Sequence, residues 1–112
     1  MSFAPFDVVV VPFPYSDKLA QKRRPALVES APALGAELGR LWVVMITSDR
    51  RARLRGDAPL GDLAAAGLPV ASIVRASKIA TIEVARVVRG AGRLSATDEA
   101  AARLALRNCA GF

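Results

Sequence analysis

The sequence contains no histidine and only one cysteine, Cys109, among its 112 residues. The absence of imidazole excludes serine–histidine and cysteine–histidine nucleophiles, and it also excludes RNA cleavage by a pair of histidines. One cysteine provides neither a disulfide framework nor a set of zinc ligands. Any catalysis must therefore come from arginines, lysines, hydroxyls and a few carboxylates, and we expect no metal and no cofactor.

Phosphate-binding loops and long apolar runs are also absent. The segment Gly90-Ala91-Gly92 lacks the residues that would complete a phosphate-binding motif, so it is predicted to form a turn. No apolar run is long enough to span a bilayer, and the N-terminus does not resemble a signal peptide. We therefore expect a cytoplasmic protein that does not bind membranes.

Acidic residues are in the minority, with ten Asp and Glu against sixteen Lys and Arg, so the net charge is +6. Hydrophobic residues make up 53% of the chain and charged residues 23%, which is a globular composition. The length suits a single domain, residues 1–112, with one modest core. A polyanion such as nucleic acid is the partner that this charge favours.

Short apolar segments rich in β-branched residues predict a mainly β protein. Strands are predicted at residues 6–13, 25–30, 40–47, 70–74 and 78–83, with a short apolar piece at 85–88. Loops are predicted at 14–24 and 48–56 and a turn or short excursion at 32–39, whereas 57–67 has helical spacing interrupted by glycines. Ser95 with Asp98 resembles a capping box and begins one C-terminal helix. Five or so strands joined by short loops favour a small, strongly bent antiparallel barrel.

The segment Lys22–Val28 places three cations directly before a proline and an apolar run. Because proline fixes φ and has no N–H, Pro25 suits the first residue of a strand. Arg24 would then sit at a loop–strand junction, where its rigid fork of donors could bind a phosphate. Taken alone, the segment is more often a solvated basic loop that leads into a strand.

Several segments, in this order, resemble the MazF/PemK family of toxins from type II toxin–antitoxin systems. They are FDVVVVPFPYSD (6–17), KRRPALV (22–28) with Ser30, VMITS (44–48), AGLPVASIVRASKIATIE (66–83) and GRLS (92–95), the last two being similar to the PemK-like branch. The resemblance implies an SH3-like small β-barrel of the CcdB/PemK type that forms a homodimer. It also implies a metal-independent, sequence-selective endoribonuclease that leaves a 2′,3′-cyclic phosphate and a 5′-hydroxyl. A cognate antitoxin with an acidic, flexible tail would neutralise it by covering the RNA groove.

The resemblance assigns roles to individual residues. Arg24 matches the family's catalytic arginine, Thr47 matches a threonine at the end of the third strand, and Arg75 matches an arginine that some members use as a proton donor. The family's catalytic aspartate is replaced here by Ser77, which leaves the general base open between Asp17 and Asp49. Further candidates for contacts with RNA have a basic or hydroxyl side chain or lie in the loops predicted at 14–24 and 48–56. They are Tyr15, Asp17, Lys22, Arg23, Ser48, Arg50, Ser77 and Lys78.

Two aromatic side chains are candidates for stacking on bases. Trp42 stands inside an apolar strand and is expected in the core, whereas Tyr15 stands in a loop and is the better candidate for stacking. Cys109 is expected to pack without a chemical role.

Two other functions compete with the nuclease. A gyrase-directed toxin with the same barrel would act through a C-terminal end that contains tryptophan, but this chain ends in Asn108-Cys109-Ala110-Gly111-Phe112. The second alternative is a non-catalytic or decayed RNA-binding barrel. Ser77 supports it, because it replaces the family's catalytic aspartate.

Overall fold

The computed structural model describes residues 2–13, 22–50 and 53–111. Six strands form one antiparallel sheet in the order β4-β5-β3-β2-β1-β6. The strands are β1 (Asp7–Phe13), β2 (Lys22–Val28), β3 (Arg40–Ser48), β4 (Asp57–Pro59), β5 (Ser72–Glu83) and β6 (Arg89–Arg93). The helices are α1 (Pro32–Leu38), α2 (Leu63–Ala66), the 3₁₀ turn η1 (Val84–Arg86) and α3 (Ala96–Ala110). The predicted class, mainly β with a C-terminal helix, is confirmed.

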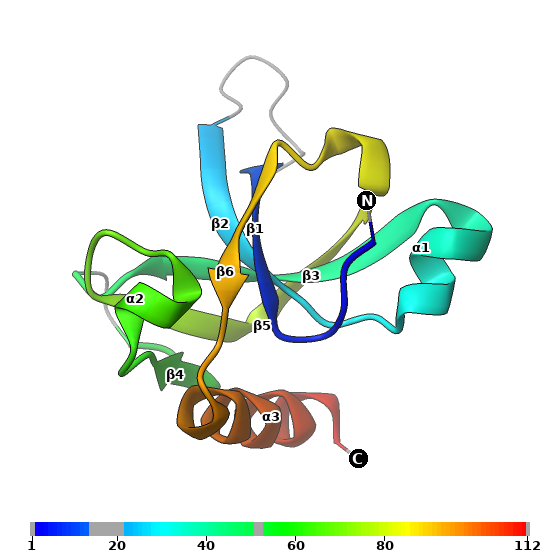
Figure 1. Cartoon of the computed structure of the whole chain (residues 1–112). Helices are drawn as coiled ribbons and strands as arrows, with labels where there is room; N and C mark the ends of the chain where they lie inside the picture. The colour runs from blue at the N-terminus through cyan, green and yellow to red at the C-terminus, as the bar shows by residue number, and fades with distance from the viewer. Residues whose placement is uncertain (1, 14–21, 51–52, 112) are drawn as a thin grey trace.

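The sheet bends strongly, so that β1, β2 and β6 run across the direction of β3 and β5 (Figure 1). Its two faces bury separate sets of side chains. One face carries Val8, Leu27, Val44, Ile46 and Val74 and packs against Ala66 of α2 and Ala102 of α3. The other face carries Val9, Val11, Ala26, Val28, Leu41, Val43, Met45, Ile82 and Val87. Neighbouring valines of β1 are thus buried on opposite faces, as its continuous apolar run predicts.

One long strand replaces the two strands predicted at 70–74 and 78–83. β5 runs without a break through both segments, and its register against β3 shifts where Val44 pairs with Ile79 but Met45 pairs with Arg75. The three residues 76–78 are therefore extra and form a bulge. A bulge bends a strand without a turn, so no glycine or proline was needed at the bend and none marked it in the sequence.

The segment 32–39, predicted as a turn or short excursion, is the helix α1. Pro32 stands in its first turn, and Gly39 ends it with a positive φ of 65°. Proline at the start and glycine just after the end are the usual helix boundaries, because the missing N–H costs nothing there and glycine adopts the left-handed conformation freely.

Pro25 is the fourth residue of β2 and not its first, which corrects the predicted start of that strand. It pairs with Val10 of β1, while the ladder to β3 begins only at Ala26. The proline therefore lies where β2 has a neighbour on one side only, which is the position in a sheet that tolerates a missing N–H.

Gly90-Ala91-Gly92 belongs to β6 and is not a turn. A Cβ added to Gly92 would lie 2.4 Å from the carbonyl oxygen of Ala65, and one added to Gly67 would lie 2.1 Å from that of Ala91. The glycines thus allow the backbones of α2 and β6 to touch. This close packing explains why glycines occur here, and the short motif alone did not predict it.

The predicted N-cap of α3 is confirmed, since the Ser95 hydroxyl accepts a bond of 3.2 Å from the amide of Asp98. The carboxylate of Asp98, however, does not complete a capping box. It is buried and accepts bonds of 2.9 Å from the amides of Gly61 and Asp62. Asp98 therefore fastens the connection between β4 and α2 to the beginning of α3.

Candidate active site

Arg24 and Thr47 lie on the same face of the sheet. The register of β2 against β3 pairs Ala26 with Met45, and the ladder begins at this pair. Arg24 stands two residues before Ala26 and Thr47 two residues after Met45, so alternation along each strand directs both to the face of that pair. Residues that face each other on neighbouring strands project to the same side. Arg24 is also flanked by Val11 of β1, which is its partner in the ladder. The nuclease hypothesis requires this shared face.

Both side chains hold a buried polar atom that has no hydrogen-bond partner among the described residues: Nε of Arg24 and Oγ1 of Thr47. The threonine is only 3% exposed. Leaving a buried donor or acceptor unsatisfied costs about 1–3 kcal/mol, so native proteins rarely do it without a reason. A guanidinium donor and a hydroxyl donor on one face are of the kind that binds the non-bridging oxygens of a phosphate.

Arg75 is held by a carboxylate that the sequence did not reveal. Its Nε donates to Oδ1 of Asp57 at 3.1 Å and its NH2 donates to Oδ2 at 3.0 Å, while the two side chains are only 11% and 2% exposed. The bonds from Arg75 hold the pKa of Asp57 below its usual value, and the same bonds raise the pKa of Arg75. The pair is a fixed, buried brace between β4 and β5, so Arg75 is positioned firmly and carries its proton at all working pH values.

Asp57 escaped detection because the contact depends on register. It lies opposite Arg75 in the β4–β5 ladder, 18 residues away along the chain. The sequence pattern of residues 57–67, helical spacing interrupted by glycines, did not predict a short strand there. Its carboxylate also accepts a bond of 2.8 Å from the amide of Leu54, which fastens the end of the preceding loop.

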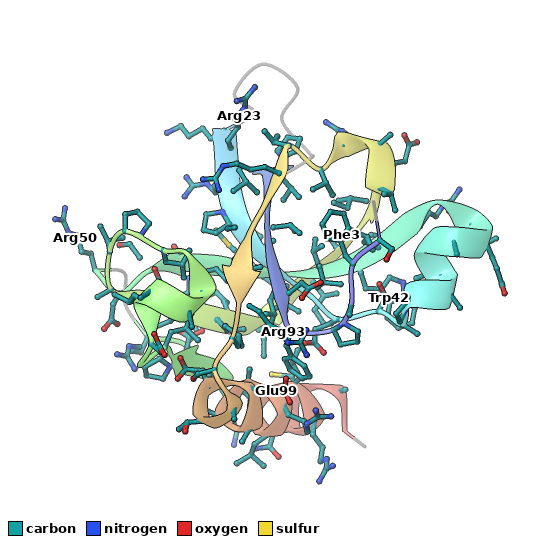
Figure 2. The ribbon with its side chains drawn as sticks, viewed as in Figure 1. Phe3, Arg23, Trp42, Arg50, Arg93 and Glu99 are labelled. Carbon is teal, nitrogen blue, oxygen red and sulfur yellow. The ribbon has the colours of Figure 1, made fainter. Side chains whose placement is uncertain are left out.

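The other predicted RNA contacts do not gather in one place. Tyr15 and Asp17 lie outside the described residues. Ser48 and Arg50 line a cavity of about 480 Å³ with Asp49, Val70 and Ala71, and the Ser48 hydroxyl accepts a bond of 3.2 Å from the Arg50 amide. Arg23 and Arg50 are exposed at separate places on the molecule (Figure 2).

Ser77 and Lys78 are exposed in the bulge of β5. Ser77 lines a different cavity, of about 1030 Å³, together with Arg55, Gly56 and residues of α3 that include Cys109. Cys109, expected to be packed, is exposed. Asp49, one of the two candidates for the general base, pairs with Arg53 at 2.7 Å.

Arg24 also lines a basic cavity. It has a volume of about 380 Å³ and is lined by Arg23, Arg24 and Arg89, with apolar walls that include Leu68 and Pro69. Arg89 was missed because residues 90–92 were read as a turn, whereas the strand β6 places Arg89 opposite Val10 of β1.

Trp42 was expected in the core because its strand is apolar. The structure contradicts this expectation, since Trp42 is 53% exposed. The face of β3 to which it belongs is covered by α3 at Val44 and Ile46 and is left open at Trp42.

Among the described residues, no group of three or more Cys, Asp or Glu side chains is arranged to hold a metal ion. No helix in the same part of the chain has the length and apolar character needed to cross a membrane.

Solved structures share this fold along almost the whole chain. An endoribonuclease from a mycobacterial species, in complex with its cognate antitoxin, matches with a TM-score of 0.78 and 18% identity, covering 99% of this chain and 97% of its own. The Mycobacterium tuberculosis toxin MazF-mt6 matches with a TM-score of 0.75 and 25% identity, covering 95% and 97%. MazF from Deinococcus radiodurans matches with a TM-score of 0.78 and 23% identity, covering 100% and 99%.

No curated protein matches the chain. The model of the PemK-like, MazF-like toxins of type II toxin–antitoxin systems matches residues 4–109. The chain therefore belongs to the PemK-like, MazF-like family of toxins of type II toxin–antitoxin systems.

Proposed function

We propose that this chain, acting as one domain over residues 1–112, is an endoribonuclease that cleaves RNA selectively by sequence and without a metal ion. The observation that carries the proposal is the pair of buried, unpartnered atoms, Nε of Arg24 and Oγ1 of Thr47, on one face of the sheet. Two solved relatives with the same fold are themselves endoribonucleases.

RNA supplies the nucleophile in this mechanism. The 2′-oxygen attacks the adjacent phosphorus, the bond from phosphorus to the 5′-oxygen breaks, and the proton of the 2′-hydroxyl leaves to a base while the 5′-oxygen gains one. The products are a 2′,3′-cyclic phosphate and a 5′-hydroxyl, and DNA is inert because it lacks the 2′-hydroxyl.

The protein then has to position the phosphate and stabilise the charge that builds on its oxygens. Arg24 and Thr47 donate to the non-bridging oxygens, and each preorganised donor of this kind is worth roughly 10²–10³ in rate. Arg75, whose pKa is raised further by Asp57, acts as a fixed cation and not as an acid. Asp49 is the candidate for the base among the described carboxylates near Thr47.

Three partners belong to this proposal: RNA, a second copy of the chain, and a cognate antitoxin whose acidic tail covers the basic groove. Relatives have been crystallised with their cognate antitoxins, which supports the last of these.

The test is incubation of the purified protein with a long RNA of mixed sequence in the presence of EDTA, with DNA of the same sequence alongside. We expect cleavage of the RNA alone, at a limited set of sites, with cyclic phosphate and 5′-hydroxyl ends. Binding of RNA without cleavage would support the non-catalytic barrel that Ser77 suggests, and inhibition of gyrase without either would support a gyrase-directed toxin.

A further inference from the structure

Arginines from two strands line one cavity at the end of the sheet where β2 and β6 both begin (Figure 1). Arg23 and Arg24 belong to β2 and Arg89 to β6, and the cavity has a volume of about 380 Å³. Arg89 pairs with Val10 of β1, which pairs in turn with Pro25 of β2, so these three residues share one face of the sheet. The cavity therefore lies over three neighbouring strands, β6, β1 and β2.

The positive charge of this cavity has no counter-charge within the described part of the chain, where none of the three guanidiniums forms an ion pair. Arg23 and Arg89 are exposed, and Arg89 donates from Nη1 to the carbonyl oxygen of Gly90 over a long 3.5 Å. Like charges that gather in this way repel one another, so an anion bound among them would stabilise the cluster. The fork of donors of an arginine suits the oxygens of a phosphate.

The other residues that line the cavity are uncharged and mostly apolar. Leu68, Pro69 and Val88 are among them, and Val88 is 40% exposed. This wall is held in place at Gly67, which packs so closely against β6 that an added Cβ would lie 2.1 Å from the carbonyl oxygen of Ala91. A ligand that fits must offer an anion to the arginines and an apolar surface to this wall. A nucleotide offers both, in its phosphate and its flat base.

The cavity is continuous with the candidate active site through Arg24. Alternation along β2 directs the Arg24 side chain to the face that carries Thr47, and Arg24 also lines the cavity. The ladder from β2 to β3 begins only at Ala26, so among the described strands β3 does not cover the edge of β2 at Arg23 and Arg24. An RNA strand held at Arg24 can therefore continue around this open edge towards Arg89.

We propose that the cavity is a subsite for a second nucleotide of the RNA, next to the scissile step, with Arg23 and Arg89 on its phosphate and Leu68 and Pro69 against its base. The inference rests on the proposed function, because it names where that same substrate is held. Arg89 is a positioning residue in this arrangement, since it binds the strand and does not touch the phosphate that is cleaved. An acidic peptide would supply carboxylates to the arginines but little flat apolar surface to the wall, so the cavity favours RNA.

The experiment is equilibrium binding of a 2′-O-methyl RNA, which cannot be cleaved because it has no free 2′-hydroxyl, over a range of salt concentrations. Each phosphate contact on a single strand contributes about 0.7 to the slope of log affinity against log salt. Arg89→Gln should therefore lower that slope by about 0.7 and weaken binding about fivefold at about 0.1 M salt. Arg40→Gln is the matched control, because it removes the same charge from an exposed position at the start of β3, outside the cavity, and should change both quantities much less.

A thermodynamic cycle locates the contact on the strand. One phosphate of the same oligonucleotide at a time is replaced by an uncharged methylphosphonate. At one position we expect the replacement to weaken binding by wild type about fivefold and to leave Arg89→Gln unaffected, because that pair is already broken. In cleavage of unmodified RNA, Arg89→Gln should raise KM and keep kcat within a few-fold, a division that a general loss of structure would not produce.

An unchanged salt slope in Arg89→Gln, equal effects of Arg89→Gln and Arg40→Gln, or additive losses at every methylphosphonate position would overturn the subsite. Intact RNA binding by Arg89→Gln together with weakened binding of poly-glutamate would also overturn it, and would assign the cavity to an acidic peptide. The proposed function fails separately, because a wild type that binds the analogue with the expected slope but cleaves no RNA would contradict the nuclease and leave the nucleotide-binding cavity in place.

Discussion

At the scale of single residues, the candidate site stands out through two unsatisfied atoms. Without ligand, burial of Nε of Arg24 and Oγ1 of Thr47 works against folding. Residues that a fold retains at such a cost commonly serve function, and the chemistry of both atoms points to an oxyanion.

Replacement of Thr47 by valine separates function from stability. The variant keeps the shape of the side chain and removes the unsatisfied hydroxyl, so we expect unchanged or slightly greater stability in urea. Cleavage of RNA should fall roughly 10²-fold, since one donor to the phosphate is lost. Unchanged cleavage would contradict the proposed role of the hydroxyl in catalysis. A large loss of stability would show that the hydroxyl has a structural role.

The pair formed by Asp57 and Arg75 should behave as a buried brace. Asp57→Asn removes the carboxylate that pairs with Arg75 in a buried position, and loss of one partner of a buried pair costs about 3–5 kcal/mol. Chemical denaturation measures this loss. As a control, Asp49→Asn breaks the more exposed pair with Arg53 and should cost less than about 1 kcal/mol.

The same pair predicts how stability responds to acid. Because the pKa of Asp57 is lower in the folded protein, its contribution is complete above the usual value of 3.8 and is lost as the pH falls through the folded value. Wild type should therefore lose stability below pH 4 more steeply than Asp57→Asn. Parallel acid-unfolding curves would contradict the assignment.

Glu29 predicts the opposite trend. Its pKa in the folded chain is raised from 4.5 to about 7, so the folded state holds a proton that the unfolded state releases. The monomer should lose stability as the pH rises from 4.5 through 7, and Glu29→Gln should remove that decline. Denaturation at protein concentrations too low for association measures it, and a wild-type curve that rises over this range would contradict the raised pKa.

At the scale of elements, a buried carboxylate fastens the beginning of α3 to the connection between β4 and α2. Asp98 accepts the amides of Gly61 and Asp62, so Asp98→Ala leaves two donors unsatisfied and should cost about 2–4 kcal/mol. Ser95→Ala removes only the N-cap and should cost about 1 kcal/mol. Equal losses in urea denaturation would show that the clamp adds nothing beyond helix capping.

The sequence predicted elements well where one strand is apolar by itself, as in β1 and β3. It failed where the reason lies in another part of the chain. The glycines of β6 serve the approach of α2, and the bulge of β5 is visible only against β3. The helix α1 could have been predicted, since Pro32 and Gly39 bound it as helix boundaries usually are.

The site divides in the same way. Arg24 and Thr47 were proposed from a resemblance, and the register places them on one face. Asp57 and Arg89 were missed, because the contact of Asp57 and the cavity of Arg89 are formed by segments that are distant in the sequence. No local pattern carries such information.

At the scale of the whole molecule, the charge of +6 and the cavity of Arg23, Arg24 and Arg89 favour binding to a polyanion. In the proposed mechanism, however, Arg24 does more than attract RNA, because it also donates to the scissile phosphate. Arg23 is its natural control, since it has the same charge, is adjacent in β2 and lines the same cavity.

The most direct measurement is therefore the single-turnover rate of RNA cleavage, in EDTA, by wild type, Arg24→Ala and Arg23→Ala. Arg24→Ala should lose roughly 10²–10³ in rate at saturating RNA, because the donor to the phosphate is gone. Arg23→Ala should weaken binding of RNA and leave the rate at saturation within a few-fold. Wild-type cleavage by Arg24→Ala, or equal losses in the two variants, would contradict the assignment of Arg24 to the scissile phosphate.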